Sequence, residues 1–129
     1  MPDSYQHIVA DVERGVLVIT VKETQLRDFE LAKKLEAEMK QAVIDSRAKN
    51  VVLDLQNVVM LTSAALLSLM GLRALVLDNS GQLVICNLSD IVAQALTVSQ
   101  LIVERRNVGA HFKLAGDRAS AVSMLQTDG

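Results

Sequence analysis

Two short apolar runs constrain the fold of this chain more than any other feature of its sequence. They are VVLDL at Val51–Leu55 and QLVIC at Gln82–Cys86. Consecutive apolar residues rich in β-branched side chains are typical of strands buried on both faces, as in parallel sheets covered by helices. A helical pattern lies between them, so we expect a crossover connection and a largely parallel sheet.

A hairpin is expected before these strands. The segments His7–Val12 and Val16–Val21 carry alternating and β-branched residues, and they flank Glu13-Arg14-Gly15. This pattern indicates two antiparallel strands joined by a tight, glycine-containing turn.

Helix signals separate the predicted strands. Asp28 can cap a helix whose apolar residues recur every fourth position, from Leu31 to Val43. A second helix follows Thr62-Ser63 and ends at Asn79-Ser80-Gly81, where Gly81 suits a left-handed conformation.

The end of the chain continues the alternation. Ser89 can cap a helix that includes Val92 and Leu96, and Ala110–Leu114 is a candidate last strand. Asp117 can cap a final helix. The segment from Ser99 to Gly109 gives no clear signal.

The resulting order, β-β-α-β-α-β-α-β-α, predicts the α/β class. We expect a mixed, mostly parallel sheet of about four to five strands, begun by an antiparallel hairpin and packed with about four α-helices. The 129 residues suit a single domain spanning 1–129, with its core at about 5–126.

Composition excludes several classes of partner. The chain has 13 Lys plus Arg against 15 Asp plus Glu, and 2% aromatic residues, so nucleic acid is not expected as a partner. The most apolar run, Val58–Leu77, is interrupted by polar residues and does not predict a membrane span. The single cysteine and the absence of a leader pattern at the start favour a cytoplasmic protein.

Enzyme signatures are absent from the sequence. It contains no phosphate loop, dinucleotide fingerprint, nucleophile elbow, HExxH or CxxC. His7, His111 and Cys86 could form a site only through a coincidence of folding, and ordinary structural roles are the simpler interpretation. We therefore expect no cofactor, no metal site and no catalysis.

Polar residues at the carboxyl ends of the parallel strands are the candidates for function. Asp54 ends VVLDL, and a structural role through hydrogen bonds to nearby backbone is favoured over catalysis. The loops at Thr62-Ser63 and Asn87–Ser89 leave two neighbouring strands on the same edge, so we expect them to lie close together.

Thr62 and Ser63 have two compatible interpretations. A hydroxyl just before a helix commonly caps its first turn, and that role requires no function. A hydroxyl at the open edge of a sheet is also accessible to a kinase, and a helix amino end tolerates the phosphate. The helix that follows is apolar on every side, which predicts outward-facing contacts at Leu67 and Met70, with burial of both in the core as the alternative.

These segments resemble a known family. NVVLDLQNVVMLTSAALLSLMGL, followed by GQLVICNLSDIVAQAL, is similar to the STAS domain, named for sulfate transporters and anti-sigma factor antagonists. In that family a strand ending in Asp-Leu leads into an Asp-Ser-Ser-Gly-Leu signature. The resemblance extends over nearly the whole chain.

The resemblance implies a cytoplasmic anti-sigma factor antagonist. Such a protein binds an anti-sigma factor, often itself a serine kinase, and phosphorylation of the first signature serine stops that binding. The serine corresponds to Ser63, with Thr62 as second choice, whereas Thr62, Ala64 and Ala65 replace the family's Asp, Ser and Gly. The expected partner contacts are Asp28, Thr62, Ser63, Ala64, Leu67, Met70 and Asn87.

Two other functions remain open from the sequence. A scaffold module of a signalling assembly would use the Leu-rich helix for self-association, as a weak homodimer. A nucleotide- or ligand-binding module would use the edge formed by Thr62 and Asn87.

Overall fold

The two buried runs lie side by side at the centre of a five-stranded sheet. In the computed structural model of the chain, β4 (Val51–Asp54) pairs in parallel with β6 (Leu83–Cys86). β2 (Val16–Val21) lies beside β4, and β7 (Lys113–Ala115) lies beside β6, both in parallel. β1 (Ile8–Glu13) joins β2 antiparallel, giving the order β1-β2-β4-β6-β7. The expected mixed α/β sheet is confirmed.

The structure describes residues 5–98 and 113–126. The last expected strand is found at β7, and its predicted first residues, 110–112, lie outside the described residues. The weakly patterned segment Ser99–Gly109 also lies outside them.

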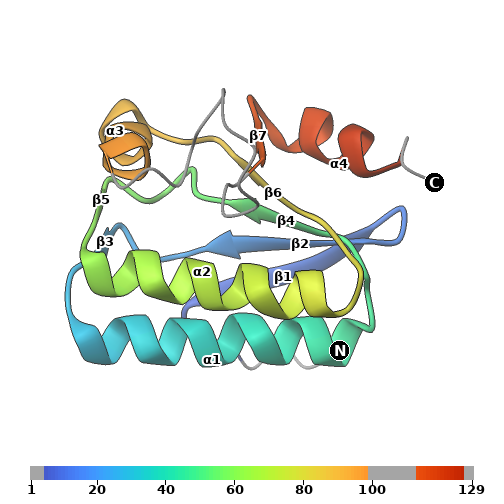
Figure 1. Cartoon of the computed structure of the whole chain (residues 1–129), viewed down its shortest axis with the longest axis horizontal. Coiled ribbons are helices and arrows are strands. Elements are labelled where there is room, and N and C mark those ends of the chain that lie inside the picture. Colours follow the sequence, from blue (N-terminus) through green and yellow to red (C-terminus); the bar gives the residue numbers. More distant parts are fainter. Residues whose placement is uncertain (1–4, 99–112, 127–129) are drawn as a thin grey trace.

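Helices cover both faces of this sheet (Figure 1). α1 (Phe29–Ser46) and α2 (Ser63–Asp78) pack side by side on one face. α4 (Arg118–Gln126) lies on the opposite face, and α3 (Asp90–Val98) lies at one end of the sheet.

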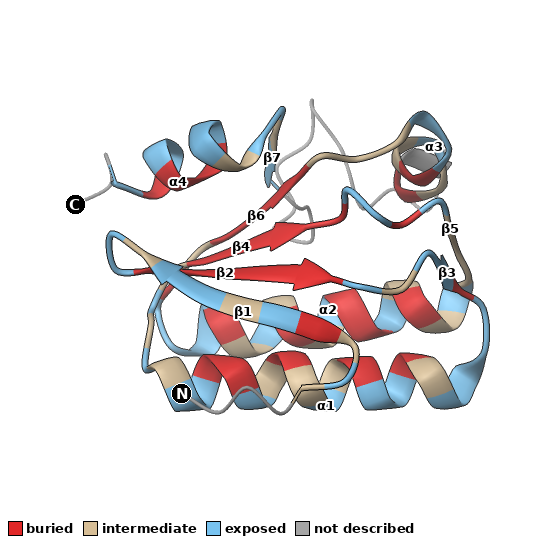
Figure 2. Cartoon of the chain, turned by 180° about the vertical axis from the view of Figure 1, so that it is seen from behind, coloured by how far each residue is buried: buried red, intermediate tan, exposed pale blue. Residues whose placement is uncertain are grey.

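β2 contributes to both cores, and Figure 2 shows it buried along its whole length. Its side chains alternate, so that Leu17 and Ile19 face the larger core under α1 and α2, while Val16 and Val18 face the smaller core under α4. β4 and β6 divide their side chains in the same way, which explains why these strands are apolar at consecutive positions.

Three helices begin at the capping residues that the sequence predicts. The Asp28 carboxylate accepts a hydrogen bond from the Leu31 N–H at 2.7 Å, and the Ser89 hydroxyl oxygen accepts one from the Val92 N–H at 3.2 Å. The Asp117 carboxylate accepts one from Ser120 N–H at 2.7 Å. All three predicted caps are confirmed, and each satisfies an amide that the helix itself leaves without an acceptor.

The end of α2 corrects one prediction. The left-handed residue is Ser80, with φ of 65°, and not Gly81. Gly81 is required for a different reason, because a Cβ at this position would overlap the carbonyl oxygen of Lys49. Its N–H donates to the Val76 carbonyl at 2.9 Å, which closes the helix.

A second, two-stranded sheet was not predicted. β3 (Gln25–Leu26) pairs in parallel with β5 (Met60–Leu61), beyond the carboxyl ends of β2 and β4. Strands of two residues are too short to produce a recognisable alternation, so the sequence carries no signal for them. Their pairing brings the chain before α1 against the chain before α2.

Candidate functional site

The small sheet places Thr62 and Ser63. Directly after β5, the Thr62 N–H donates to the Leu26 carbonyl at 3.0 Å, and the Thr62 hydroxyl donates to the same carbonyl at 3.2 Å. Thr62 has an extended backbone, and α2 begins at Ser63. These two bonds fix the start of α2 against the segment that leads into α1.

The expected hydroxyl cap of α2 is wrong. Thr62 occupies the N-cap position, but its side chain makes no capping hydrogen bond because its hydroxyl points to Leu26. The first intrahelical bond runs from the Leu66 N–H to the Thr62 carbonyl at 3.0 Å. The N–H groups of the three preceding residues, Ser63–Ala65, have no hydrogen-bond acceptor within the described part of the chain.

Ser63 lies on an open groove between α2 and α3. Ser63 is exposed, whereas Thr62 and Ala64 are half-buried. One wall of the groove comes from β5 and the start of α2, and the other from α3. The lining residues are Leu61, Thr62, Ser63, Leu66, Ile91, Gln94 and Ala95. With Ile91 63% exposed, the groove offers apolar surface beside the Ser63 hydroxyl.

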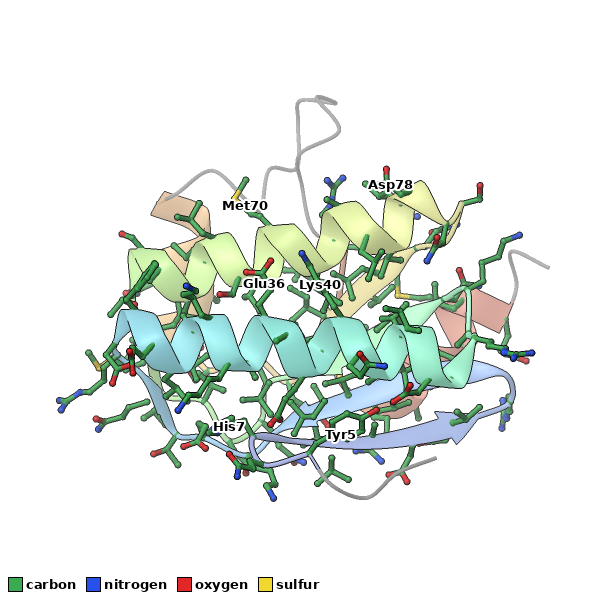
Figure 3. All side chains as sticks on the ribbon, turned by 90° about the horizontal axis from the view of Figure 1, so that it is seen from below. Tyr5, His7, Glu36, Lys40, Met70 and Asp78 are labelled. Carbon is green, nitrogen blue, oxygen red and sulfur yellow. The ribbon has the colours of Figure 1, made fainter. Side chains whose placement is uncertain are left out.

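An apolar stripe extends from Ser63 along the outer side of α2. The exposed side chains of Leu67 (64%), Met70 (39%) and Leu77 (44%), with the exposed Ala74, are spaced three or four residues apart. Figure 3 shows Met70 on the side of α2 that is remote from α1. The predicted exposure of Leu67 and Met70 is confirmed.

Asp54 is the centre of a buried polar cluster at the carboxyl ends of the strands. The residue is 1% exposed, and its Oδ1 accepts hydrogen bonds from the Gln56 N–H at 3.0 Å and the Asn87 side-chain amide at 3.1 Å. The Arg118 guanidinium lies 3.6 Å from Oδ2. The predicted bond between Asp54 and nearby backbone is confirmed.

Arg118 extends the cluster to two more strands. Its guanidinium donates to the Thr20 hydroxyl at 2.8 Å and pairs with the Glu13 carboxylate at 3.3 Å. Sequence reasoning missed Arg118, because 64 residues separate it from Asp54 and no local pattern links them.

Two predicted contact residues, Asn87 and Asp28, are not among those that line the groove. Asn87 adopts a left-handed conformation with φ of 59° and directs its amide to Asp54. Asp28 is exposed and caps α1, two residues after the Leu26 carbonyl that holds Thr62. Contact of either residue with a partner stays a prediction.

The Cys86 thiol and the His7 ring lie in surroundings that suit structural roles. Burial, and then the charge of Asp54, raise the pKa of the Cys86 thiol to about 12, so the thiol stays protonated in the core under α4. His7 lies 2.6 Å from the Glu23 carboxylate, while His111 lies outside the described residues.

Across residues 5–98 and 113–126, no three His, Cys, Asp or Glu side chains gather to hold a metal ion. Among the helices of the same ranges, none has the length and apolar character of a membrane crossing.

Comparison with family models gives a match to the STAS domain over residues 7–112. The chain belongs to the STAS domain family. The comparison with curated proteins gave no match.

Solved structures share this STAS fold along their whole lengths. An anti-sigma factor antagonist from Mycobacterium paratuberculosis is 22% identical, with a TM-score of 0.71 over 98% of this chain and 97% of that one. The anti-sigma factor antagonist SpoIIAA in its unphosphorylated form is 12% identical, with a TM-score of 0.65 over 95% and 98%. The phosphorylated form of the Bacillus cell fate determinant SpoIIAA is 14% identical, with a TM-score of 0.62 over 91% and 97%. At these identities the likeness establishes the fold alone.

The structure explains one departure from the STAS signature. Ala65, which the resemblance aligns with the signature glycine, is fully buried in the larger core. Its methyl group therefore fills space between α2 and the sheet and does not obstruct the exposed surface at Ser63. Thr62, which the resemblance aligns with the signature Asp, has a hydroxyl that donates to the Leu26 carbonyl, whereas a carboxylate could only accept.

Proposed function

We propose that this STAS domain, spanning residues 1–129, is a cytoplasmic anti-sigma factor antagonist that acts by binding and not by catalysis. Its partner is an anti-sigma factor with serine kinase activity, and phosphorylation of Ser63 ends the binding. The observation that carries the proposal is the exposed Ser63 hydroxyl at a helix start whose first amides have no acceptor among residues 5–98 and 113–126.

These free amides make Ser63 suited to phosphorylation. A phosphate at Ser63 would bring roughly −1.5 to −2 charges to the positive end of the helix dipole. The N–H groups of Ser63–Ala65 are available to its oxygens, because the Thr62 side chain does not cap them. The fold would therefore accept the modification without rearrangement.

The surface around Ser63 suits a protein partner. The apolar stripe of α2, formed by Leu67, Met70, Ala74 and Leu77, begins one turn after Ser63, and the exposed Ile91 lies on the other wall of the groove. Apolar surface of this kind is typical of protein interfaces. A solvated dianion at its edge would oppose the desolvation that binding requires, so phosphorylation would weaken the complex.

The test combines binding with mapping of the modification. Wild type and Ser63→Ala should recover a kinase-like anti-sigma factor from lysate of the source cell, and Ser63→Asp should not. Ser123→Asp is the matched control, because Ser123 is an exposed helical serine on the opposite face of the sheet. Mass spectrometry of the protein incubated with the recovered kinase should place phosphate on Ser63, and phosphorylation should persist in Thr62→Val.

Equal recovery of the anti-sigma factor by wild type and Ser63→Asp would rule out the switch. Phosphate on Thr62 alone would move the modification site to the second candidate. If no anti-sigma factor is recovered and the purified protein instead forms a dimer that Leu67→Glu disrupts, the α2 stripe serves self-association, and the scaffold function replaces the proposed one.

A further inference from the structure

We infer that Asp54 and Asn87 are positioning residues that hold α3 in place as the second wall of the groove beside Ser63. The juxtaposition that supports this is the Asn87 side-chain amide on Asp54 Oδ1, at 3.1 Å, at the start of the turn into α3. That the position of α3 affects partner binding at the groove rests on the proposed function. That Asp54 and Asn87 hold α3 in place does not.

Asp54 is well placed to act as an anchor. Its carboxylate is buried at the end of β4, between β2 and β6, and it is held on both oxygens. Oδ1 receives the Gln56 N–H and the Asn87 amide, and Oδ2 faces the Arg118 guanidinium at 3.6 Å. A buried carboxylate with three polar partners has few alternative arrangements, because each lost partner removes a hydrogen bond or a charge partner that water does not replace in the interior.

Asn87 transmits this anchoring to α3. Its left-handed backbone turns the chain out of β6, and two residues later Ser89 caps α3 through the Val92 N–H and accepts the Ala93 N–H on its carbonyl at 2.9 Å. The amide bond to Asp54 therefore ties the turn that sets where α3 begins. Within the first two turns of that helix, Ile91, Gln94 and Ala95 line the groove together with Ser63.

The same carboxylate links α3 with α4. Arg118, at the first residue of α4, contacts Asp54, Thr20 and Glu13. The body of α3 is held by the buried side chains of Val92 and Leu96, which belong to the larger core. The bond between Asn87 and Asp54 adds to this by fixing the turn from which α3 begins.

The variant Asn87→Gly tests this role. Glycine adopts the left-handed conformation without strain, so the substitution removes the amide bond and leaves the turn intact. Ser80→Gly is the matched control, because Ser80 is also left-handed and lies at the far end of α2. Asn87→Asp is a second variant, which places another carboxylate against Asp54 and should act in the same direction more strongly.

Two measurements on the protein without a partner test whether the bond between Asn87 and Asp54 holds α3 in place. In Asn87→Gly, amide hydrogen exchange in α3 should be about tenfold faster, the loss expected for one hydrogen bond to a charged group, while exchange in α1 and α2 stays unchanged. The amide resonances of Ser63 and Leu66 should shift, since α3 is their neighbour across the groove. Ser80→Gly should show neither effect. Unchanged α3 exchange and unchanged Ser63 resonances in both Asn87 variants would overturn the inference.

Neither measurement needs a partner, so they separate this inference from the proposed function. Faster α3 exchange in a protein that recovers no anti-sigma factor would uphold the positioning role and count against the proposed function. If an anti-sigma factor is recovered and binds wild type and Asn87→Gly equally, the position of α3 does not matter for binding, which would overturn the functional part.

Discussion

The hydroxyl of Thr62 donates to the carbonyl of Leu26 at 3.2 Å, across 36 residues of sequence. This bond turns the side chain away from the first amides of α2, so a residue of a type that ordinarily caps a helix leaves that helix uncapped. The consequence is an amino end that is open to an anion beside the exposed Ser63.

Thr62→Asp should stabilise the protein relative to Thr62→Ala. An aspartate accepts hydrogen bonds from the first-turn amides and places negative charge at the positive end of the dipole, which is worth about 1 kcal/mol. Urea unfolding of the two variants measures the difference in free energy of unfolding. An Asp variant that is less stable than the Ala variant would show that the Leu26 contact matters more than the cap.

Ser68→Ala should destabilise the packing of α1 against α2. The Ser68 hydroxyl is buried and donates to the Ala32 carbonyl of α1 at 2.8 Å. Its loss should cost about 1 kcal/mol in the free energy of unfolding by urea. Ser123→Ala, at an exposed helical position, controls for the higher helix propensity of alanine and should be neutral or slightly stabilising. Equal effects of the two variants would contradict a role for the interhelical bond.

The effect of Gly71→Ala on the free energy of unfolding should depend on Glu36, its neighbour on α1. A Cβ at Gly71 would overlap the Glu36 carboxylate, which pairs with Lys40 at 2.8 Å. Figure 3 shows Glu36 and Lys40 between the two helices. In a Glu36→Ala background the substitution should stabilise α2 by about 0.5–1 kcal/mol, the usual gain for replacing a helical glycine. In the wild-type background the gain should be smaller, because the Glu36 side chain has to move. A double-mutant cycle measured by urea unfolding gives the coupling free energy between Gly71→Ala and Glu36→Ala. A coupling of zero would disprove the close approach of Glu36 to Gly71.

The free energy of unfolding should fall at alkaline pH because the Tyr5 phenol ionises less readily in the folded chain than in the unfolded chain. Burial, followed by the hydrogen bond to Asp45, raises the pKa of Tyr5 from 10.0 to about 12. The folded chain then keeps a proton that the unfolded chain releases. The stabilisation is therefore complete below pH 10 and is lost as the pH rises toward 12. Because Tyr5 is the only tyrosine and the chain has no tryptophan, ultraviolet titration reports it directly.

Asp45→Asn is the matching variant. It removes the charge that opposes ionisation of the phenol, so the Tyr5 midpoint should move down toward its ordinary value. An unchanged midpoint would mean that Tyr5 does not contact Asp45 in solution.

The elements predicted from sequence are those with local signals. β4 and β6 were found from their apolar runs, and the caps at Asp28, Ser89 and Asp117 from residue type and position. Each of these depends on residues within a few positions of one another. The paired β3 and β5 were missed because two-residue strands have no periodicity.

The candidate site was predicted in part. Ser63 and the exposure of Leu67 and Met70 followed from the pattern of α2 and from resemblance to the STAS signature. The role of Arg118 was not predicted, since its contacts with Thr20 and Glu13 join residues about a hundred positions apart. The bond from the Asn87 amide to Asp54 was not predicted either, and contact of Asn87 with a partner stays a prediction.

By itself, the sequence determined the order of strands and helices, the two-sided burial of the central strands and the family, because these depend on periodic local patterns. Only the tertiary structure decided which polar groups are free and which are occupied. The Thr62 hydroxyl is bound by the Leu26 carbonyl and the Asn87 amide by the Asp54 carboxylate, while the amides at Ser63 find no acceptor in the part of the chain that the structure describes. The physical reason is that a hydrogen bond depends on distance in space, and the sheet brings together groups that the chain keeps far apart.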